Sequence, residues 1–147
     1  MFGSLDISTS GLVAQRTRMT AIADNIANQR TLLGPDGAYA PFEARSVLFT
    51  AGDRTSGSND GVTATVTRQP DFRWADPTDP AEQIPRQVAE AARKAGMVND
   101  DGMIPVPDIN EIGQFVDSME ALRSYEANIS VADATKRMID GALQLLA

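Results

Sequence analysis

Cysteine and histidine are both missing from this 147-residue chain. Without cysteine the chain forms no disulfide, and without either residue it offers no zinc site of the Cys/His kind. The same absences exclude every catalytic scheme that needs a cysteine nucleophile or a histidine base. Aromatic residues are also few, at 5% of the chain with a single tryptophan, Trp74. Stability must therefore come from packing or from assembly, and a large share of enzyme mechanisms is excluded.

Basic residues are outnumbered, with 13 Lys and Arg against 20 Asp and Glu and a net charge of −7. Nucleic-acid binders gain much of their affinity from basic groups that release phosphate counterions. Because the excess is acidic and the basic residues are not clustered, we expect no nucleic-acid partner. The charge is also uneven: residues 1–30 carry three basic and two acidic groups (+1), and residues 108–147 carry three basic and seven acidic groups (−4). This asymmetry weakly favours pairing of the two ends.

Long apolar runs are missing too. No run of about 18 apolar residues occurs, so the sequence predicts no membrane span. Residues 1–6 lack the basic region and the apolar stretch of a secretory signal peptide, so we expect no cleaved signal. A composition of 42% hydrophobic and 22% charged residues is nevertheless ordinary for a folded chain with a modest core.

The first 30 residues predict a coiled-coil helix over residues 4–28, with Ser4 as its N-cap. The turn sequence of residues 34–37, Gly-Pro-Asp-Gly, ends any helix before it. A strict seven-residue apolar repeat is typical of a coiled-coil seam rather than of a globular surface helix. The same side chains would form a core, and we expect core and assembly surface to be one set. These apolar residues recur at steps of seven, with Ile22 completing the last turn: Leu5, Leu12, Met19 and Ile26.

Residues 108–147 predict a second, longer helix that follows Pro105 and Pro107 and is capped by Asp108 or Asn110. At about 1.5 Å per residue it would be roughly 58 Å long, against about 30 Å for a compact globule of this size. It must therefore extend beyond its own domain or be covered by partner chains. Its predicted seam follows alternating steps of three and four: Phe115, Ser118, Leu122, Tyr125, Ile129, Ala132, Lys136, Ile139, Leu143 and Leu146.

Residues 31–107 between the two helices predict a small irregular β-hairpin and an extended linker. Residues 39–50 and 62–66 have strand character and are joined by a flexible polar loop. Residues 83–95 predict a short, loosely held helix. The predicted fold class is therefore mainly α, with two long terminal helices that pair as an antiparallel coiled coil, residues 1–30 and 108–147 forming one axial domain.

The best candidate for chemistry is a set of four carboxylates on one stretch of chain. Paired carboxylates act in acid–base catalysis or bind a hard cation. The spacing matches no calcium loop, and two prolines hold the stretch extended, so a solvated acidic turn is favoured. A serine–lysine pair with Lys136 is discounted because this side chain more readily extends its ammonium group to water. We predict no enzyme activity, no cofactor and no metal from this set: Asp71, Asp76, Asp79 and Glu82.

Two stretches resemble the terminal signatures of the flagella basal body rod protein family, which comprises rod and hook proteins. Residues 5–28 are similar to its Ser-Gly-Leu motif, helix and Asn-Asn-x-Ala-Asn, with Asp24 in place of the first Asn. Residues 125–138 are similar to its Tyr-Glu-Ala-Asn followed by Ala-x-Lys-x-Met. The residues that carry the resemblance are Ser10, Gly11, Leu12, Asn25, Ala27, Asn28, Asp76, Pro77, Pro80, Tyr125, Glu126, Ala127, Asn128 and Lys136.

The length and the middle of the chain resemble the short proximal-rod members of this family. One short type begins its first helix with Leu-Asp-Ile-Ser and carries Asp-Pro-x-x-Pro after its strands, as residues 5–8 and 76–80 do here. A second short type remains a rival. Asp79 stands where the family usually has His, and residues 81–100 are a longer insertion than usual, so their role stays open.

The resemblance implies a structural subunit. In this family copies stack helically about a central export channel and transmit torque. The implied partners are other rod subunits, further copies and the flagellar export apparatus, and the implied location is the periplasmic rod of the basal body. Asn25, Asn28 and Asn128 either contact another subunit or hydrogen-bond neighbouring backbone. The alternative is a cytoplasmic coiled-coil adaptor or flagellar export chaperone, which would not copurify with detergent-resistant basal bodies.

Overall fold

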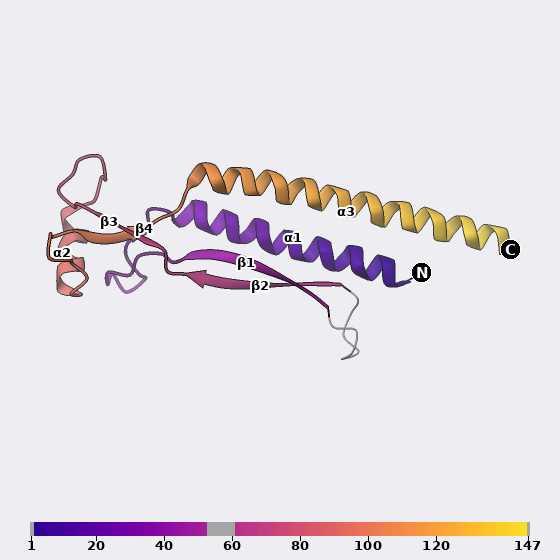
Figure 1. The fold of residues 1–147 in the computed structure, drawn as a ribbon, viewed down its shortest axis with the longest axis horizontal. Helices are drawn as coiled ribbons and strands as arrows, with labels where there is room; N and C mark the ends of the chain where they lie inside the picture. The colour runs from indigo at the N-terminus through magenta and orange to yellow at the C-terminus, as the bar shows by residue number, and fades with distance from the viewer. Residues whose placement is uncertain (1, 53–60, 147) are drawn as a thin grey trace. The chain divides into compact units, whose positions relative to one another are not determined.

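The computed structural model describes residues 2–52 and 61–146, so most of the predicted hairpin loop lies outside the described residues (Figure 1). The prediction of a mainly α chain with a small β insert is confirmed. Helix α1 has 27 residues and helix α3 has 36. The elements follow the order α1 (Phe2–Asn28), β1 (Ala44–Ala51), β2 (Val62–Gln69), β3 (Phe72–Ala75), α2 (Arg86–Lys94), β4 (Ile104–Pro107) and α3 (Glu111–Leu146).

The chain divides into two compact units. The first unit comprises Met1–Ala23, Ser46–Thr67 and Ile112–Ala147, and the second comprises Asp24–Arg45 and Arg68–Glu111.

Within the part of the chain described above, no helix combines the length and apolarity needed to cross a membrane.

In the first unit, α1 lies beside α3 and beside the β1–β2 hairpin (Figure 1). The Arg18 guanidinium of α1 lies 3.4 Å from the Asp117 carboxylate and 3.5 Å from the Glu120 carboxylate of α3. Nearer the start of α1, Gly11 lies against Asn128. Because the residue number in α3 rises as that in α1 falls, the two helices run in opposite directions.

Strands β1 and β2 form a two-stranded sheet, as the hairpin prediction requires. The Gly52 N–H donates to the Gly61 carbonyl at 2.6 Å, and the Thr67 hydroxyl donates to the Ser46 carbonyl at 3.3 Å. The partner's residue number rises from 61 to 67 as the number on the β1 side falls from 52 to 46, so the strands are antiparallel.

The second unit has its own hydrophobic core. Strands β3 and β4 pair antiparallel, with Arg73 opposite Val106 and Ala75 opposite Ile104, which places these four residues on one face of the sheet. The Tyr39 hydroxyl donates to a carbonyl of β4 at 2.6 Å, and burial raises the pKa of Tyr39 to about 12. The core residues are Tyr39, Ala75, Val88, Ala92, Ile104 and Val106.

Helix α2 is an integral part of this core, so the prediction of a loosely held helix is wrong. Val88, Ala89 and Ala92 are buried, and Ala92 is fully inaccessible. Small side chains indicated weak packing in the sequence, but on α2 they allow the helix to approach its neighbours closely. The helix ends where Gly96 adopts a φ of 71°, a conformation that glycine adopts without strain.

The element boundaries differ from the predicted ones most at the first strand, which was predicted from residue 39 and begins at Ala44, and the predicted N-cap of α1 is also wrong. This helix begins at Phe2, so Ser4 lies inside it and is not the N-cap. Strand β4 ends at Pro107, as predicted, although Pro105 lies within it. A two-stranded sheet has only edge strands, where a residue without an N–H is tolerated. Helix α3 follows directly after Asn110, one of the two predicted caps.

Candidate assembly site

The two signature stretches meet at Gly11 of α1 and Asn128 of α3. A Cβ atom at position 11 would lie 2.9 Å from Asn128 Nδ2 and 3.3 Å from its Cγ. Such an approach is too close for ordinary packing, so the glycine leaves the space that the asparagine side chain fills. This contact explains a glycine in the interior of a helix, where it costs roughly 0.5–1 kcal/mol relative to alanine.

Ser10 connects α1 to the β1–β2 hairpin. Its Oγ donates to the Ile7 carbonyl at 2.7 Å and accepts a hydrogen bond from the Val62 N–H at 3.0 Å. The approach depends on Gly61, because a Cβ atom there would clash with Ser10 Oγ. The neighbouring signature residues Ser10 and Gly11 therefore contact the hairpin and α3 respectively.

In the second unit, Asn25 binds the start of β1 through both ends of its amide. Its Nδ2 donates to the Arg45 carbonyl at 2.8 Å, and its Oδ1 accepts from the Arg45 N–H at 2.7 Å. The side chain is only 3% exposed and satisfies backbone groups as a neighbouring strand would. The adjacent Asp24 forms an ion pair with the Arg45 guanidinium. The departure from the family motif at position 24 thus has a cationic partner in this chain.

Asn28 satisfies backbone and side-chain groups at the end of α1. Its Nδ2 donates to the Asp24 carbonyl at 2.9 Å, and its Oδ1 accepts from the Thr31 hydroxyl at 3.2 Å. The Thr31 N–H in turn donates to the Asn28 carbonyl at 2.9 Å. The last carbonyls of a helix lack partners within the helix, so these bonds define where α1 stops. Of the two interpretations offered for the signature asparagines, bonding to nearby backbone describes Asn25 and Asn28.

The residues predicted for the coiled-coil seam differ in how far they are buried within the single chain. Ile22 is buried, and a further group is partly buried: Leu5, Leu12, Met19 and Ile26 in α1, and Tyr125 and Ile139 in α3. Ser118 and Ala132 of the predicted seam are also partly buried, whereas four large side chains of α3 are exposed in this single chain: Phe115, Leu122, Ile129 and Leu143.

Several buried residues of the two long helices are smaller than the predicted seam residues and were not among them. Ala14 and Ala21 are buried in α1, and Ala121 and Thr135 are buried in α3. Reasoning from large apolar residues missed them. A usable signal was present, because Ala121, Asn128 and Thr135 recur at steps of seven. Small side chains at that spacing let helix backbones approach closely.

The remaining C-terminal signature residues lie at the surface. Glu126, Ala127 and Lys136 are all exposed. Nothing within this chain explains them as core residues.

The predicted acidic turn binds groups of its own unit. Asp76 Oδ1 accepts from the Thr78 N–H at 2.8 Å and from the Thr78 hydroxyl at 2.7 Å, and these hydrogen bonds lower the pKa of Asp76. Glu82 forms two hydrogen bonds of 2.7 Å with the Arg73 guanidinium, which lower the pKa of Glu82. Across residues 2–52 and 61–146, no group of three or more His, Cys, Asp or Glu side chains could hold a metal ion.

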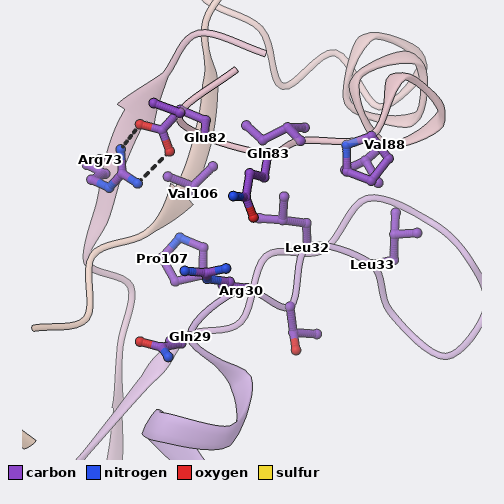
Figure 2. A pocket seen from close by; sticks show the side chains of 14 residues that line it. Gln29, Arg30, Leu32, Leu33, Arg73, Glu82, Gln83, Val88, Val106 and Pro107 are labelled. Carbon is purple, nitrogen blue, oxygen red and sulfur yellow. Dashed lines mark hydrogen bonds and ion pairs between the residues drawn. The ribbon is translucent and has the colours of Figure 1, made fainter. Parts of the chain in front are cut away.

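A pocket of about 460 Å³ in the second unit includes the Arg73–Glu82 pair in its wall (Figure 2). Figure 2 shows apolar side chains around it, among them Leu32 and Val106, with Arg30 beside them. The titratable groups among its lining residues are Arg30, Arg73 and Glu82, and the last two bind each other.

Comparison with known proteins matches almost the entire chain, although no protein-family model matches it. The chain is similar to the flagellar basal-body rod protein FlgC of Salmonella typhimurium (strain LT2), with 32% identity over 143 residues, 95% of this chain and 93% of that protein. It is 28% identical to FlgC of Bacillus subtilis (strain 168) over 161 residues, with 98% of this chain and 97% of that protein covered. For FlgC of Borreliella burgdorferi the identity is 28% over 159 residues, covering 99% and 97%.

Proposed function

The chain belongs to the FlgC family of flagellar basal-body rod proteins, and we propose from this membership that it is a structural subunit of the flagellar rod. The resemblance to the rod proteins is thereby confirmed, and the relatives reported above are all of the FlgC type. A cytoplasmic adaptor or export chaperone is not favoured.

The terminal helices of the subunit pair as an antiparallel coiled coil. Two contacts between α1 and α3 support this arrangement: Arg18 with Asp117 and Glu120, and Gly11 with Asn128. The seven-residue spacing of apolar residues in α1 supports it as well. In the rod, these paired helices stack side by side with those of other subunits and transmit torque.

Two observations on burial support the proposal. Ser10, Gly11 and Asn25 make contacts within the chain, so part of the signature holds the subunit's own elements together. Four large apolar side chains of the predicted α3 seam, in contrast, are exposed in the single chain: Phe115, Leu122, Ile129 and Leu143. Exposed apolar surface of this kind marks a contact with other proteins. The partners proposed are further copies, other rod subunits and the export apparatus.

The location follows from the same role. The subunit is exported through the flagellar secretion channel and incorporated into the periplasmic rod, where its helices line the channel. No catalysis is proposed, because a rod subunit acts through shape and packing.

Substitution of Leu12 by aspartate tests this function. Fully burying a leucine stabilises by roughly 1.5–3 kcal/mol, and a carboxylate in its place adds a desolvation cost. Leu12 is partly buried, and we expect the rest of its surface to be covered in the rod. We therefore expect Leu12→Asp cells to synthesise the protein normally but to lose motility and basal-body incorporation.

The matched control is Thr20→Asp, which places the same charge at an exposed position of the same helix. Motility assays and immunoblots of detergent-resistant basal bodies measure both variants. Normal swimming of Leu12→Asp cells would contradict the proposed packing of α1. A wild-type protein found only in the soluble cytoplasmic fraction would contradict the rod function itself.

A further inference from the structure

The side of α3 opposite Asn128 is apolar in the first half of the helix and acidic in the second half. Met119 and Asn128 are nine residues apart and therefore lie about half a turn from each other, on opposite sides of the helix. Around Met119 runs a set of large apolar side chains, each between 48% and 76% exposed, which we call the α3 stripe: Ile112, Phe115, Val116, Met119 and Leu122. At further steps of seven from Met119 stand Glu126, Asp133 and Asp140, so the line that Met119 occupies is acidic beyond Leu122. The exposed apolar side chains further along α3, such as Val131 and Met138, lie away from that line.

A groove of about 510 Å³ lies in the same unit between α1 and β2. We call it the α1–β2 groove. Its lining side chains are small or β-branched, and Val13 within it is 61% exposed. The lining residues used below are Asp6, Val13 and Thr17.

We propose that the α1–β2 groove of one copy receives the α3 stripe of a second copy. This inference rests on the proposed function and names the surfaces by which copies of this chain contact one another. The groove is concave and lined by small side chains, whereas the stripe projects Phe115 and Met119 from a convex helix surface. Burying both surfaces would remove apolar area from water, which favours association of the two copies.

The length and charge of the two surfaces match. Asp6 to Thr17 along α1 and Ile112 to Arg123 along α3 each span eleven residue steps, or about 17 Å. Asp6 is the charged residue among those lining the groove, and Arg123 is the first charged residue after the stripe. Both side chains are exposed and neither forms an ion pair with another described residue. Pairing Asp6 with Arg123 makes α1 of one copy antiparallel to α3 of the next.

The contact joins two different surfaces, so it is heterologous. A heterologous contact leaves a free groove on one copy and a free stripe on the other, and it repeats into a ring or an open helical array. Contact between two like stripes would instead close a dimer and stop growth.

Cysteine pairing tests the contact directly, because the chain has no cysteine of its own. In the proposed register, Val13 lies opposite Val116 of the next copy, and a disulfide forms only when the two Cβ atoms approach closely. In oxidised basal bodies, the Val13→Cys/Val116→Cys variant should give disulfide-linked oligomers of this chain, and each single variant should give none. The control pairs Val13→Cys with Val131→Cys, whose side chain is exposed on α3 outside the stripe, and should also give none.

The outcomes separate this inference from the proposed function. Three results would each overturn the inference but not the proposed function. They are normal incorporation without a Val13–Val116 link, a link to a protein of different mass, and dimers formed by Val116→Cys alone. Absence of the unsubstituted chain from basal bodies would overturn the proposed function. For the direction, Asp6→Arg and Arg123→Asp should each lower incorporation, and the double reversal should restore it. Failure of the double reversal to restore it would overturn the antiparallel pairing.

Discussion

Substitution of Gly11 by alanine isolates the contact between the two signature stretches. The added Cβ atom would lie 2.9 Å from Asn128 Nδ2, so the asparagine must move by several tenths of an ångström. Overpacking of this kind costs typically 1–3 kcal/mol. The helix gains up to about 1 kcal/mol when alanine replaces glycine. We therefore expect Gly11→Ala to destabilise the first unit by roughly 0–3 kcal/mol.

Gly141 provides the matched control on α3, because a Cβ atom there would meet nothing within 4 Å. Gly141→Ala should therefore stabilise by about 0.5–1 kcal/mol, or less if the helix end frays. Hydrogen exchange of α1 and α3 amides measures the first unit. Fluorescence of Trp74, the single tryptophan, reports the second unit separately and should not change.

A double-mutant cycle with Asn128→Ala completes the test. Once the asparagine side chain is removed, Gly11→Ala should stabilise as Gly141→Ala does. The coupling energy between positions 11 and 128 should then fall in the range of about 0.5–3 kcal/mol that contacting residues show. If the two substitutions are additive, or if Gly11→Ala alone stabilises as much as the control, the close contact between Gly11 and Asn128 does not exist.

Two further predictions concern the second unit and use Trp74 fluorescence during unfolding. The folded state holds Tyr39 neutral up to a pKa of about 12, whereas the unfolded state loses this proton near pH 10. The contribution of Tyr39 to stability should therefore be constant below pH 10 and fall by up to about 2–3 kcal/mol toward pH 12. Tyr39→Phe should remove that fall, and an identical alkaline transition in this variant would refute the assignment. Ala92→Asp should unfold the unit, since it places an unpaired carboxylate in a fully buried position of α2, whereas the exposed Glu90→Ala on the same helix should change little. A native fluorescence signal from Ala92→Asp would show that α2 is not part of the core.

Much of the local structure was readable from the residues alone. The seven-residue repeat of α1, the alternation of residues 62–66 and the glycine–proline turn after α1 each act over a few residues, so periodicity reveals them. The excluded chemistry also followed from composition, because a chain without cysteine and histidine lacks those nucleophiles and bases wherever it folds. The signature stretches at both ends were sufficient to predict the family.

The candidate site could be predicted only in part, because burial depends on residues distant in sequence. The large apolar residues of α3 dominated its pattern, yet Ala121 and Thr135 are the buried ones. Periodicity ranks positions by hydrophobicity and does not say which side of a helix meets a neighbour. Gly11 and Asn128 are 117 positions apart, and their contact explains both residues at once.

Helix α2 shows most clearly which features the sequence predicts and which depend on the tertiary structure. The residues of 83–95 indicated a helix, and α2 forms there, because helix formation depends on local propensity. Its tight packing could not be seen in small side chains such as Ala92, because an alanine contributes little apolar surface by itself. Only the tertiary structure places that alanine against Ile104 and Tyr39 in one core. Close packing depends on the shapes of all the surfaces that meet, and these come together only when the chain folds.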